Sequence, residues 1–439
     1  MKVTFGGGTA VAVIWLLGAG HASAQSVVLQ TLTASPPVRG EYFGARVSMS
    51  GDVAAVSAPS AGFDLAAVTG GVVHVFRYGD GGTWIPEQIL QPADRSRAVS
   101  FGMSVTVNGA VIVVSGYENN ACTDKPLCIR AAAWVFRYDY VNRAWKEEQK
   151  LAPADAATVS LLDWQEQIGP YVSVSGTTMI LGLHFDAARG PNTGSAYIYR
   201  FDGTAWNQEQ KLTSANAAAG DWFGLEVAVS GDVAVVGAFF DTVDLFLRPG
   251  VKFAGSAHVY RYDGRRWNLE QVLTPYFDGH EGDLFGTSLA ISGDVILVGA
   301  TTSDEAEHDA GAAYVFRYNR GLRLWLQEQK LTASDDTAFA EFGRSVSLNG
   351  DVALVAAFRD FTTGERSGAV YVFRRAGGRW VEQEKIYSPN PAPFDRFGRS
   401  ISLSGDVALI CAYRKDDACP DDRDCDSGAA YLVAVGKQP

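Results

Sequence analysis

The chain repeats one order of apolar and polar positions, and the clearest copy runs from Phe285 to Ser334. A Phe-Gly pair opens an alternating segment, a Ser-Gly-Asp turn follows, and an unbroken apolar segment then ends in Gly-Ala. A polar loop, the segment AAYVFRY and a Trp-x-x-Glu-Gln segment complete the copy. Alternation is typical of a strand with one buried face, and an unbroken apolar run is typical of a strand covered on both faces. Each copy therefore predicts four short strands.

Phe-Gly pairs divide the chain into seven such units at intervals of 55 to 67 residues, and one pair is degenerate, Ile168-Gly169. The intact pairs are Phe43-Gly44, Phe101-Gly102, Phe223-Gly224, Phe285-Gly286, Phe342-Gly343 and Phe397-Gly398. Repeated four-stranded units are typical of a β-propeller, in which each unit forms one blade of a closed ring. We therefore expect an all-β, seven-bladed β-propeller with four-stranded antiparallel blades, formed by residues 25–439 as a single domain.

The ring is expected to close through the N-terminus. Only six units have the tryptophan that opens the fourth strand, because the last unit stops after its third strand, near Val435. Val27 to Thr33 (VVLQTLT) resembles the end of a fourth strand (EQKLTAS) and precedes the first Phe-Gly pair. We predict that Ser26 to Ala34 joins the C-terminal blade as its outermost strand, which protects apolar faces that an open ring would expose.

Short and long connections alternate along each unit. The turns after the first and third strands are stereotyped, often Gly-Asp, Asn-Gly or Asp-Gly, which suit two-residue hairpins. The connections after the second and fourth strands vary, so they gather on the opposite face, here called the loop face. Variable loops on a rigid scaffold are where binding is usually placed. The loop face is formed by segments such as Ser57 to Gly71, Tyr117 to Ala131, Phe239 to Gly255, Thr301 to Gly311 and Tyr413 to Gly428.

These motifs resemble FG-GAP repeats, which form the seven-bladed propeller at the N-terminus of integrin α-chains and occur in many bacterial exported proteins. The Phe-Gly opener, the Gly-Ala end of the second strand and a period near 60 residues carry the resemblance over nearly the whole chain. It implies a propeller and a role in binding or cell adhesion. Integrin blades that bind calcium have an Asp-x-Asp-x-Asp-Gly loop between their first two strands. Here that connection is only SGD, SGT or NG, so no calcium ligand carries over from the family.

The N-terminus has the features of a secretory signal peptide. Lys2 gives a positive start, Ala10 to Leu17 form an apolar core, and Ala22 to Ala24 fit a cleavage site. We expect residues 1–24 to be removed and the mature protein to be exported, to the periplasm or to the extracellular space. The apolar core is shorter than the roughly 20 residues that span a bilayer, and no later stretch approaches that length. No membrane span is therefore expected in the mature chain.

Five cysteines are present, and four of them form two closely spaced pairs in polar loops. Five residues separate Cys122 from Cys128 and Cys419 from Cys425. In an oxidising compartment each pair predicts a local disulfide that pins its loop. Cys411 takes the place of a small residue in an apolar strand, so we expect a buried and inert thiol. Neither pair is followed by a second Cys or His pair at a spacing that zinc requires.

Two acidic loops are candidate metal sites. Asp422, Asp424 and Asp426 alternate within DDRDCDSG, and calcium prefers several oxygen ligands from a flexible loop. The alternative is a solvated acidic loop held by the second cysteine pair, because no glycine directly follows Asp426 and alternate side chains of an extended loop need not converge. The segment Asp304 to Asp309 (DEAEHD) is the second candidate. The sequence requires no cofactor, and calcium is the one candidate that these loops raise.

Other polar residues recur at fixed positions of the units, which favours structural roles. The acids before Phe-Gly pairs are expected to accept backbone N–H groups; they are Glu41, Asp221, Asp283 and Asp395. Third-strand arginines are expected to pair with fourth-strand glutamates. The arginines are Arg77, Arg137, Arg200, Arg261, Arg317 and Arg374, and the glutamates are Glu87, Glu148, Glu209, Glu270 and Glu328. His74 and His258 stand where other units have aromatic residues, so we expect them to pack rather than to bind a metal.

The formal net charge of −12 at pH 7 argues against a nucleic acid or an anionic membrane as partner, because both bind basic surfaces. No Ser-His-Asp or Cys-His set is placed to converge. We therefore expect a non-catalytic, exported binding or adhesion-type propeller that recognises a protein or a glycan through its loop face. The alternatives are a hydrolase or lyase with its site at the mouth of the central channel, and a structural module of an assembly. The enzyme would need polar residues to converge there, whereas the first strands are interpreted as repeated Ser/Val packing.

Overall fold

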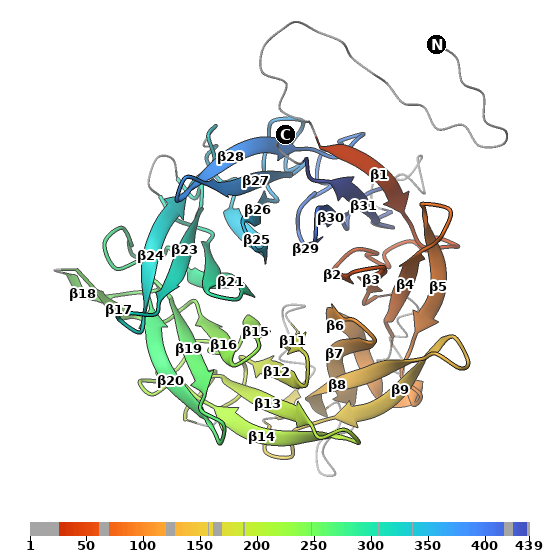
Figure 1. Cartoon of the computed structure of the whole chain (residues 1–439), viewed down its shortest axis with the longest axis horizontal. Coiled ribbons are helices and arrows are strands. Elements are labelled where there is room, and N and C mark those ends of the chain that lie inside the picture. The colour runs from red at the N-terminus through yellow and green to blue at the C-terminus, as the bar shows by residue number, and fades with distance from the viewer. Residues whose placement is uncertain are drawn as a thin grey trace, which may run out of the picture.

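The computed structural model describes residues 26–60, 70–119, 128–156, 158–160, 169–187, 189–246, 248–304, 308–335, 337–416 and 425–436. Seven antiparallel blades of four strands each, one of them extended by a short fifth strand, surround a central channel, and Figure 1 views the ring along that channel. Among the described residues the one helical element is a 3-10 turn, η1 (Arg95–Arg97). The predicted seven-bladed β-propeller is confirmed.

Each blade is a meander whose first strand lies innermost. Blade 1 contains β2 (Val47–Ser50), β3 (Val53–Ala58), β4 (Val72–Tyr78) and β5 (Trp84–Leu90). Blade 2 contains β6 (Ala98–Asn108), β7 (Val111–Asn119), β8 (Cys128–Asp139) and β9 (Ala144–Leu151), with β10 (Thr158–Ser160) paired to the start of β8. Blade 3 contains β11 (Tyr171–Ser175), β12 (Thr178–Leu183), β13 (Ser195–Phe201) and β14 (Trp206–Leu212).

The remaining blades follow the same order, with one insertion in blade 4. Blade 4 contains β15 (Val227–Ser230), β16 (Val233–Ala238), β19 (Ser256–Tyr262) and β20 (Trp267–Leu273), and its projecting hairpin is β17 (Val243–Leu245) with β18 (Arg248–Val251). Blade 5 contains β21 (Phe285–Ser292), β22 (Val295–Ala300), β23 (Ala312–Asn319) and β24 (Leu324–Leu331). Blade 6 contains β25 (Phe342–Asn349), β26 (Val352–Ala357), β27 (Ala369–Ala376) and β28 (Arg379–Ile386). Blade 7 contains β29 (Ile401–Ser404), β30 (Val407–Ala412) and β31 (Ala429–Ala434).

The fourth strand of blade 7 is the N-terminal strand β1 (Val27–Leu32), which confirms the predicted closure of the ring. It pairs antiparallel with β31, and Leu32 stands opposite Ala430. Figure 1 shows the two ends of the described chain side by side at this blade. Hydrogen bonds between the first and last strands therefore replace a covalent connection between blades 1 and 7.

The second strand of each blade is apolar because neighbouring blades cover both of its faces. In β22, Leu297 packs with Val355 of blade 6, whereas Ile296 packs on the other side with Val235 of blade 4. All residues of β22 are buried. Each blade thus has a complete core only when both of its neighbours are in place.

Fourth strands of adjacent blades are joined by a clamp between glutamine and tryptophan. The Gln271 side chain accepts the backbone N–H of Trp325 at 2.8 Å and donates to its carbonyl at 2.9 Å. Five further pairs repeat this arrangement: Gln30 with Trp84, Gln88 with Trp145, Gln149 with Trp206, Gln210 with Trp267 and Gln329 with Trp380. At the closing blade Ser26 stands in the tryptophan position, and Glu384 accepts its backbone N–H at 2.7 Å.

The predicted Arg-Glu pairs are confirmed in five blades, and they also link neighbouring blades. Arg261 donates to Glu270 of its own blade at 2.7 Å and stacks over Tyr318 of the next blade. Glu270 in turn accepts the indole N–H of Trp325 at 2.9 Å. The other pairs are Arg77 with Glu87, Arg137 with Glu148, Arg200 with Glu209 and Arg317 with Glu328. Arg374 instead donates to backbone carbonyls at the end of blade 7.

The Phe-Gly opener docks each blade onto the one before it. The backbone N–H of Phe342 donates to the carbonyl of Ala310 in blade 5 at 2.8 Å, and its ring is fully buried. Backbones approach so closely here that a Cβ atom added to Gly299 would lie 2.0 Å from the carbonyl oxygen of Gly343. Glycine recurs at these positions because two blades share the space that a side chain would need.

Serines of the first strands satisfy the open inner edge of the ring. The Ser402 hydroxyl oxygen of blade 7 accepts the backbone N–H of Met49 in blade 1 at 3.0 Å, and Ser48 accepts that of Val107 in blade 2 at 3.0 Å. A first strand has no neighbour on its channel side, so these N–H groups would otherwise depend on water. The Ser/Val alternation therefore includes a hydrogen-bonding role as well as packing.

Replacing Leu32 with alanine tests the closing strand. Leu32 is 2% exposed within the core of blades 1 and 7, so Leu32→Ala should lower the free energy of unfolding by about 2–5 kcal/mol. Leu29→Ala, in the same strand but 53% exposed, is the control and should change it by about 0.5 kcal/mol or less. Denaturant unfolding measures both, and equal effects would contradict closure by this strand.

Candidate functional site

The central channel holds a cavity of about 260 Å³ that is lined by first-strand residues of all seven blades. Serines and small apolar residues form most of its wall. Five larger polar residues enter it where the first strands begin, at the loop-face end: Arg46, Tyr171, Glu226, Arg344 and Arg399. They come from blades 1, 3, 4, 6 and 7. The mouth of the channel is therefore the place where charged residues from different blades converge.

The Phe-Gly opener positions these side chains. Arg344 and Arg399 directly follow the glycine of their openers, while Arg46 and Glu226 stand one residue later. The phenylalanine of each opener is buried and tied to the preceding blade, so the backbone that leads into the first strand is fixed in place. A charge at either position is held at the mouth by backbone that the ring keeps fixed.

The three arginines differ in their contacts. The guanidinium of Arg46 donates to the hydroxyl of Tyr171 and lies 5.0 Å from the centre of that ring. Arg344 and Arg399 lie 5.9 and 5.6 Å from the ring of Phe358, a buried residue at the end of β26. Among the described residues, no carboxylate is within 4.0 Å of any of these three guanidinium groups. The mouth thus presents cations without matched counter-charges at contact distance.

The charges at the mouth perturb one another. Burial, together with the repulsion from Arg344 and Arg46, lowers the pKa of Arg399 to about 9. Burial raises the pKa of Glu226 to about 7, although all three arginines act in the opposite direction. Arg399 stays a cation at neutral pH, but at a cost to the folded state, whereas Glu226 titrates near neutrality. An added anion would relieve the repulsion among the arginines.

A second cavity of about 180 Å³ adjoins the first and shares Tyr171, Arg344 and Arg399 with it. Its other polar lining consists of Thr287, Thr301, Thr302 and Glu341, and its apolar lining consists of Leu225, Phe239 and Leu284. Glu341 is paired with Arg359 at 2.6 Å. The two cavities share these residues and together form a recess at the mouth, lined by arginines and by oxygen-bearing side chains.

Phe358 is surrounded by four guanidinium groups. Besides Arg344 and Arg399, those of Arg359 and Arg396 lie 5.4 and 5.7 Å from its ring centre. Arg396 also donates to the hydroxyl of Tyr413 at 2.9 Å. Stacking of this kind keeps arginines in place without neutralising them. Glu341 pairs with Arg359, so Arg344, Arg396 and Arg399 are the cations of this group without a carboxylate at contact distance among the described residues, in a chain whose net charge is −12.

The predicted calcium loop is only partly described. Asp422 and Asp424 lie outside the described residues, so their convergence stays a prediction. Asp426 is described, and its backbone N–H donates to a carboxylate oxygen of Asp416 at 2.8 Å. Burial and the nearby charge of Asp426 raise the pKa of Tyr42. The Asp426 carboxylate thus already faces Tyr42 and the guanidinium of Arg414.

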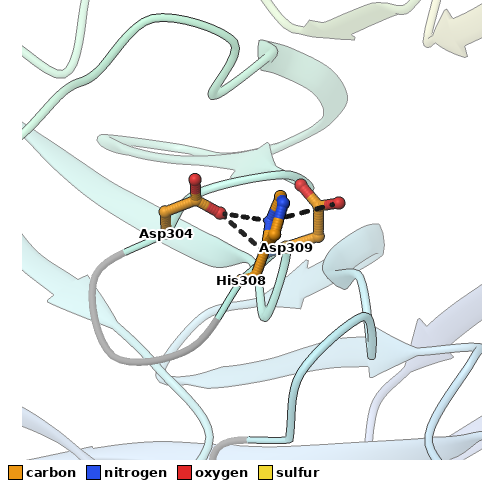
Figure 2. A group of neighbouring side chains, drawn as sticks. All are labelled: Asp304, His308 and Asp309. Atoms are coloured by element: carbon orange, nitrogen blue, oxygen red, sulfur yellow. Dashed lines mark hydrogen bonds and ion pairs between the residues drawn. The ribbon is translucent and has the colours of Figure 1, made fainter.

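The second acidic loop brings Asp304, His308 and Asp309 together, with their ligand atoms within 4.8 Å of one another (Figure 2). The Nδ1 atom of His308 lies 3.3 Å from Asp304 and 3.5 Å from Asp309. Asp304 and His308 are exposed, and the imidazole packs against Phe339. Calcium favours six to eight oxygen ligands, whereas an imidazole with carboxylates suits a transition metal better. The contacts of His308 with the two carboxylates and with Phe339 account for the cluster without a metal.

The turns between first and second strands do not fit the calcium site of integrin blades. Each turn has two residues, such as Gly51-Asp52 between β2 and β3. The aspartates of these turns face arginines instead of one another. Asp52 lies 2.8 Å from Arg77, Asp232 lies 3.2 Å from Arg261, and Asp294 lies 2.7 Å from Arg320.

The expected structural roles of the acids before Phe-Gly pairs are confirmed. Asp283 accepts the backbone N–H of His280 at 2.7 Å. Three further acids do the same three residues upstream: Glu41 for Val38, Asp221 for Ala218 and Asp395 for Ala392. His74 and His258 pack edge-on against the opener phenylalanines Phe43 and Phe223, as predicted.

The cysteines agree with the sequence prediction as far as they are described. Cys411 is a buried free thiol, and burial raises its pKa to about 11, as expected for an inert residue. Cys128 and Cys425 are buried and disulfide-bonded. Their expected partners, Cys122 and Cys419, lie outside the described residues, so the two pairings stay predictions. No helix within the described part of the chain has the length and apolarity that crossing a membrane requires.

The charged channel mouth was missed by the interpretation of the first strands as Ser/Val packing alone, and that interpretation is corrected here. The signal was present in the sequence as four exceptions to the repeat: Arg46, Glu226, Arg344 and Arg399. Each interrupts the small residues beside a Phe-Gly opener. Charged residues at the first or second position after the opener glycine, in four of the units, are the pattern that marks the site.

The FG-GAP repeat model matches residues 27–76, 145–199, 206–260, 267–316, 325–373 and 380–433, which is more than half of the chain. Each match begins in the fourth strand of one blade and ends in the third strand of the next. Comparison with curated proteins finds no match.

Two solved structures show distant likeness. The periplasmic gluconolactonase PpgL of Pseudomonas aeruginosa has 14% identity and a TM-score of 0.49, with 80% of this chain and 86% of that chain covered. Saccharomyces cerevisiae Sqt1 has 9% identity and a TM-score of 0.47, with 93% of this chain and 99% of that chain covered. These likenesses are too distant to bear on the chemistry of the channel mouth.

The raised pKa of Glu226 predicts a pH dependence of stability that Glu226→Gln should remove. An unfolded glutamate has a pKa of about 4.3, so between that value and about 7 the folded protein binds more protons than the unfolded one. The stability that Glu226 contributes is therefore full below about pH 4 and is lost as pH rises through 7. Wild type should lose stability relative to the variant by about 1.4 kcal/mol for each pH unit in this window.

Denaturant unfolding between pH 4 and pH 8 measures this difference. Glu281→Gln, which removes an exposed carboxylate, is the control and should run parallel to wild type. A constant difference between wild type and Glu226→Gln across the window would show that the pKa of Glu226 is the same in the folded and the unfolded protein, which would contradict the raised value.

Proposed function

The chain belongs to the FG-GAP repeat family, and on this scaffold we propose a binding protein that takes an anionic ligand at the loop-face mouth of its central channel. The observation that carries the proposal is the convergence of Arg46, Arg344 and Arg399 from three blades without a carboxylate at contact distance among the described residues. The ligand is the anionic group of a protein or a glycan. Guanidinium groups suit carboxylates, sulfates and phosphates because their donors match paired oxygen acceptors.

The electrostatic cost of the cluster supports a ligand-binding role. Burial lowers the pKa of Arg399, and the nearby charges of Arg344 and Arg46 lower it further, so Arg399 is held as a cation at a cost to the folded state. A concave site with perturbed charges is the usual place for binding. The net charge of the whole chain is −12, so most of its surface repels an anion, whereas the arginines at the mouth attract one.

Export completes the proposal. Residues 1–24, which lie outside the described part of the chain, have the features of a signal peptide that is removed on secretion. The disulfide-bonded state of Cys128 and Cys425 is consistent with an oxidising compartment. We propose that the mature protein works in the periplasm or outside the cell, where it meets acidic glycans and proteins.

A hydrolase or lyase at the same mouth is the second candidate function. Glu226 favours it, because a carboxyl group with a pKa of about 7 is suited to general acid or base catalysis. The variant Glu226→Gln separates the two functions. A binding protein should keep or gain affinity for anions when the carboxylate is removed, whereas an enzyme should keep binding but lose turnover by at least about a hundredfold.

Sulfate tests the anion site, because it stays doubly charged across the relevant pH range. Isothermal calorimetry at constant ionic strength should show binding to wild type, and Arg399→Ala or Arg344→Ala should weaken it about tenfold or more. Without sulfate, Arg399→Ala should melt no lower than wild type, because the substitution relieves repulsion. If Arg399 had a purely structural role, Arg399→Ala would melt at a lower temperature than wild type.

The matched control is Arg320→Ala, on the opposite face of the ring. Arg320 is 81% exposed and paired with Asp294, so its loss removes the same charge without touching the mouth. If Arg320→Ala and Arg399→Ala weakened sulfate binding equally, the loss of net charge alone would explain the effect, and the proposed site would be refuted.

A further inference from the structure

We infer that the recess at the channel mouth takes an acidic sugar unit, a ring that carries one carboxylate and several hydroxyl groups. The inference rests on the proposed anion-binding function and deepens it by naming the class of ligand. It follows from the distribution of hydrogen-bond donors, acceptors and apolar surface around the smaller cavity, which is about 180 Å³ and shares Arg344 and Arg399 with the channel.

The arginine side of this cavity offers only donors. Arg344 and Arg399 present guanidinium N–H groups and have no acceptor atoms. A carboxylate fits this side because it supplies two acceptor oxygens in one plane and neutralises part of the repulsion. Tyr171, which lines the same cavity, already accepts a hydrogen bond from Arg46, so its hydroxyl proton is free to donate as well.

The lining residues Thr287, Thr301, Thr302 and Glu341, here called the acceptor side, offer acceptors. The Thr287 hydroxyl donates to the carbonyl of Leu284, and the Thr302 hydroxyl donates to that of Gly282 at 2.5 Å. With their protons committed, these oxygens face a ligand as acceptors. Thr301 lies 3.5 Å from Thr287, and the Glu341 carboxylate is acceptor-only. Sugar hydroxyl groups supply the donors that this side lacks, whereas a sulfate ion supplies none.

The remaining wall is apolar, as the C–H face of a sugar ring requires. Leu225 and Phe239 are buried in blade 4, and Leu284 precedes the opener of blade 5. The cavity is small, about 180 Å³, and we assign it to one ring rather than to a chain. The larger channel cavity and the open mouth leave room for further units of an acidic glycan.

Ligand comparison on the wild-type protein tests the inference first. Saturation-transfer NMR and calorimetry would compare glucuronate and galacturonate with glucose, which lacks the charge, and with acetate, which lacks the hydroxyl groups. At least one of the two uronates should bind about tenfold more tightly than either comparison compound. Uronates that bind no better than acetate would overturn the inference.

A threonine variant then tests the acceptor side. Thr301→Val keeps the shape of a 3% exposed side chain but removes its hydroxyl group, and it should weaken uronate binding about fivefold while sulfate binding stays unchanged. If Thr301→Val weakened the binding of uronate and sulfate equally, a wall that recognises sugar hydroxyl groups would be contradicted. If sulfate binds through Arg344 and Arg399 but no uronate exceeds acetate, only this inference fails. If sulfate does not bind either, the proposed anion site fails with it.

Discussion

Closure of the ring is the constraint on which the rest of the structure depends. Every second strand needs a blade on each side, so a gap would open two cores at once rather than one. The chain meets this requirement at its weakest point by pairing β1 with β31 and by setting Glu384 against the backbone of Ser26. The glutamine clamps, the arginine stacks and the serine caps then repeat between neighbours, so each blade is fixed by contacts that another blade supplies.

The same contacts explain how the protein can hold like charges together. Serine hydroxyls satisfy the inner backbone, and buried phenylalanines fix the start of each first strand. Arg344 and Arg399 therefore emerge from backbone that cannot retreat when they repel one another. The proposed anion would bind to such a rigid arrangement with little further ordering, because the cations are already assembled in the folded protein. The contacts between blades thus keep the arginines of the mouth close together although they repel one another.

The residues that repeat predicted the fold, and the residues that break the repeat formed the site. Alternation, turn residues and the strand-like segment at Val27 were sufficient for seven blades and their closure. The clamp between Gln271 and Trp325 was not predictable, because its partners are 54 positions apart and meet only when two blades stack. The charged residues beside the openers could be identified in the sequence. Nothing in a linear sequence shows, however, that these positions in blades 1, 4, 6 and 7 line one channel. Burial, which raises the pKa of Glu226, is equally a property of the assembled ring.

The family repeat and the structural blade are out of step by one strand, since each matched repeat begins in a fourth strand and ends in a third. A gene segment that encodes one repeat therefore contributes to two blades. Insertion or loss of such a segment would leave the first strand and the last three strands untouched. The pairing of β1 with β31 that closes the ring would therefore be the same in rings with other numbers of blades. Because of this offset, closure by β1 and β31 does not depend on the number of blades. The number of repeats, and with it the diameter of the channel, could change while the ring is still closed in the same way.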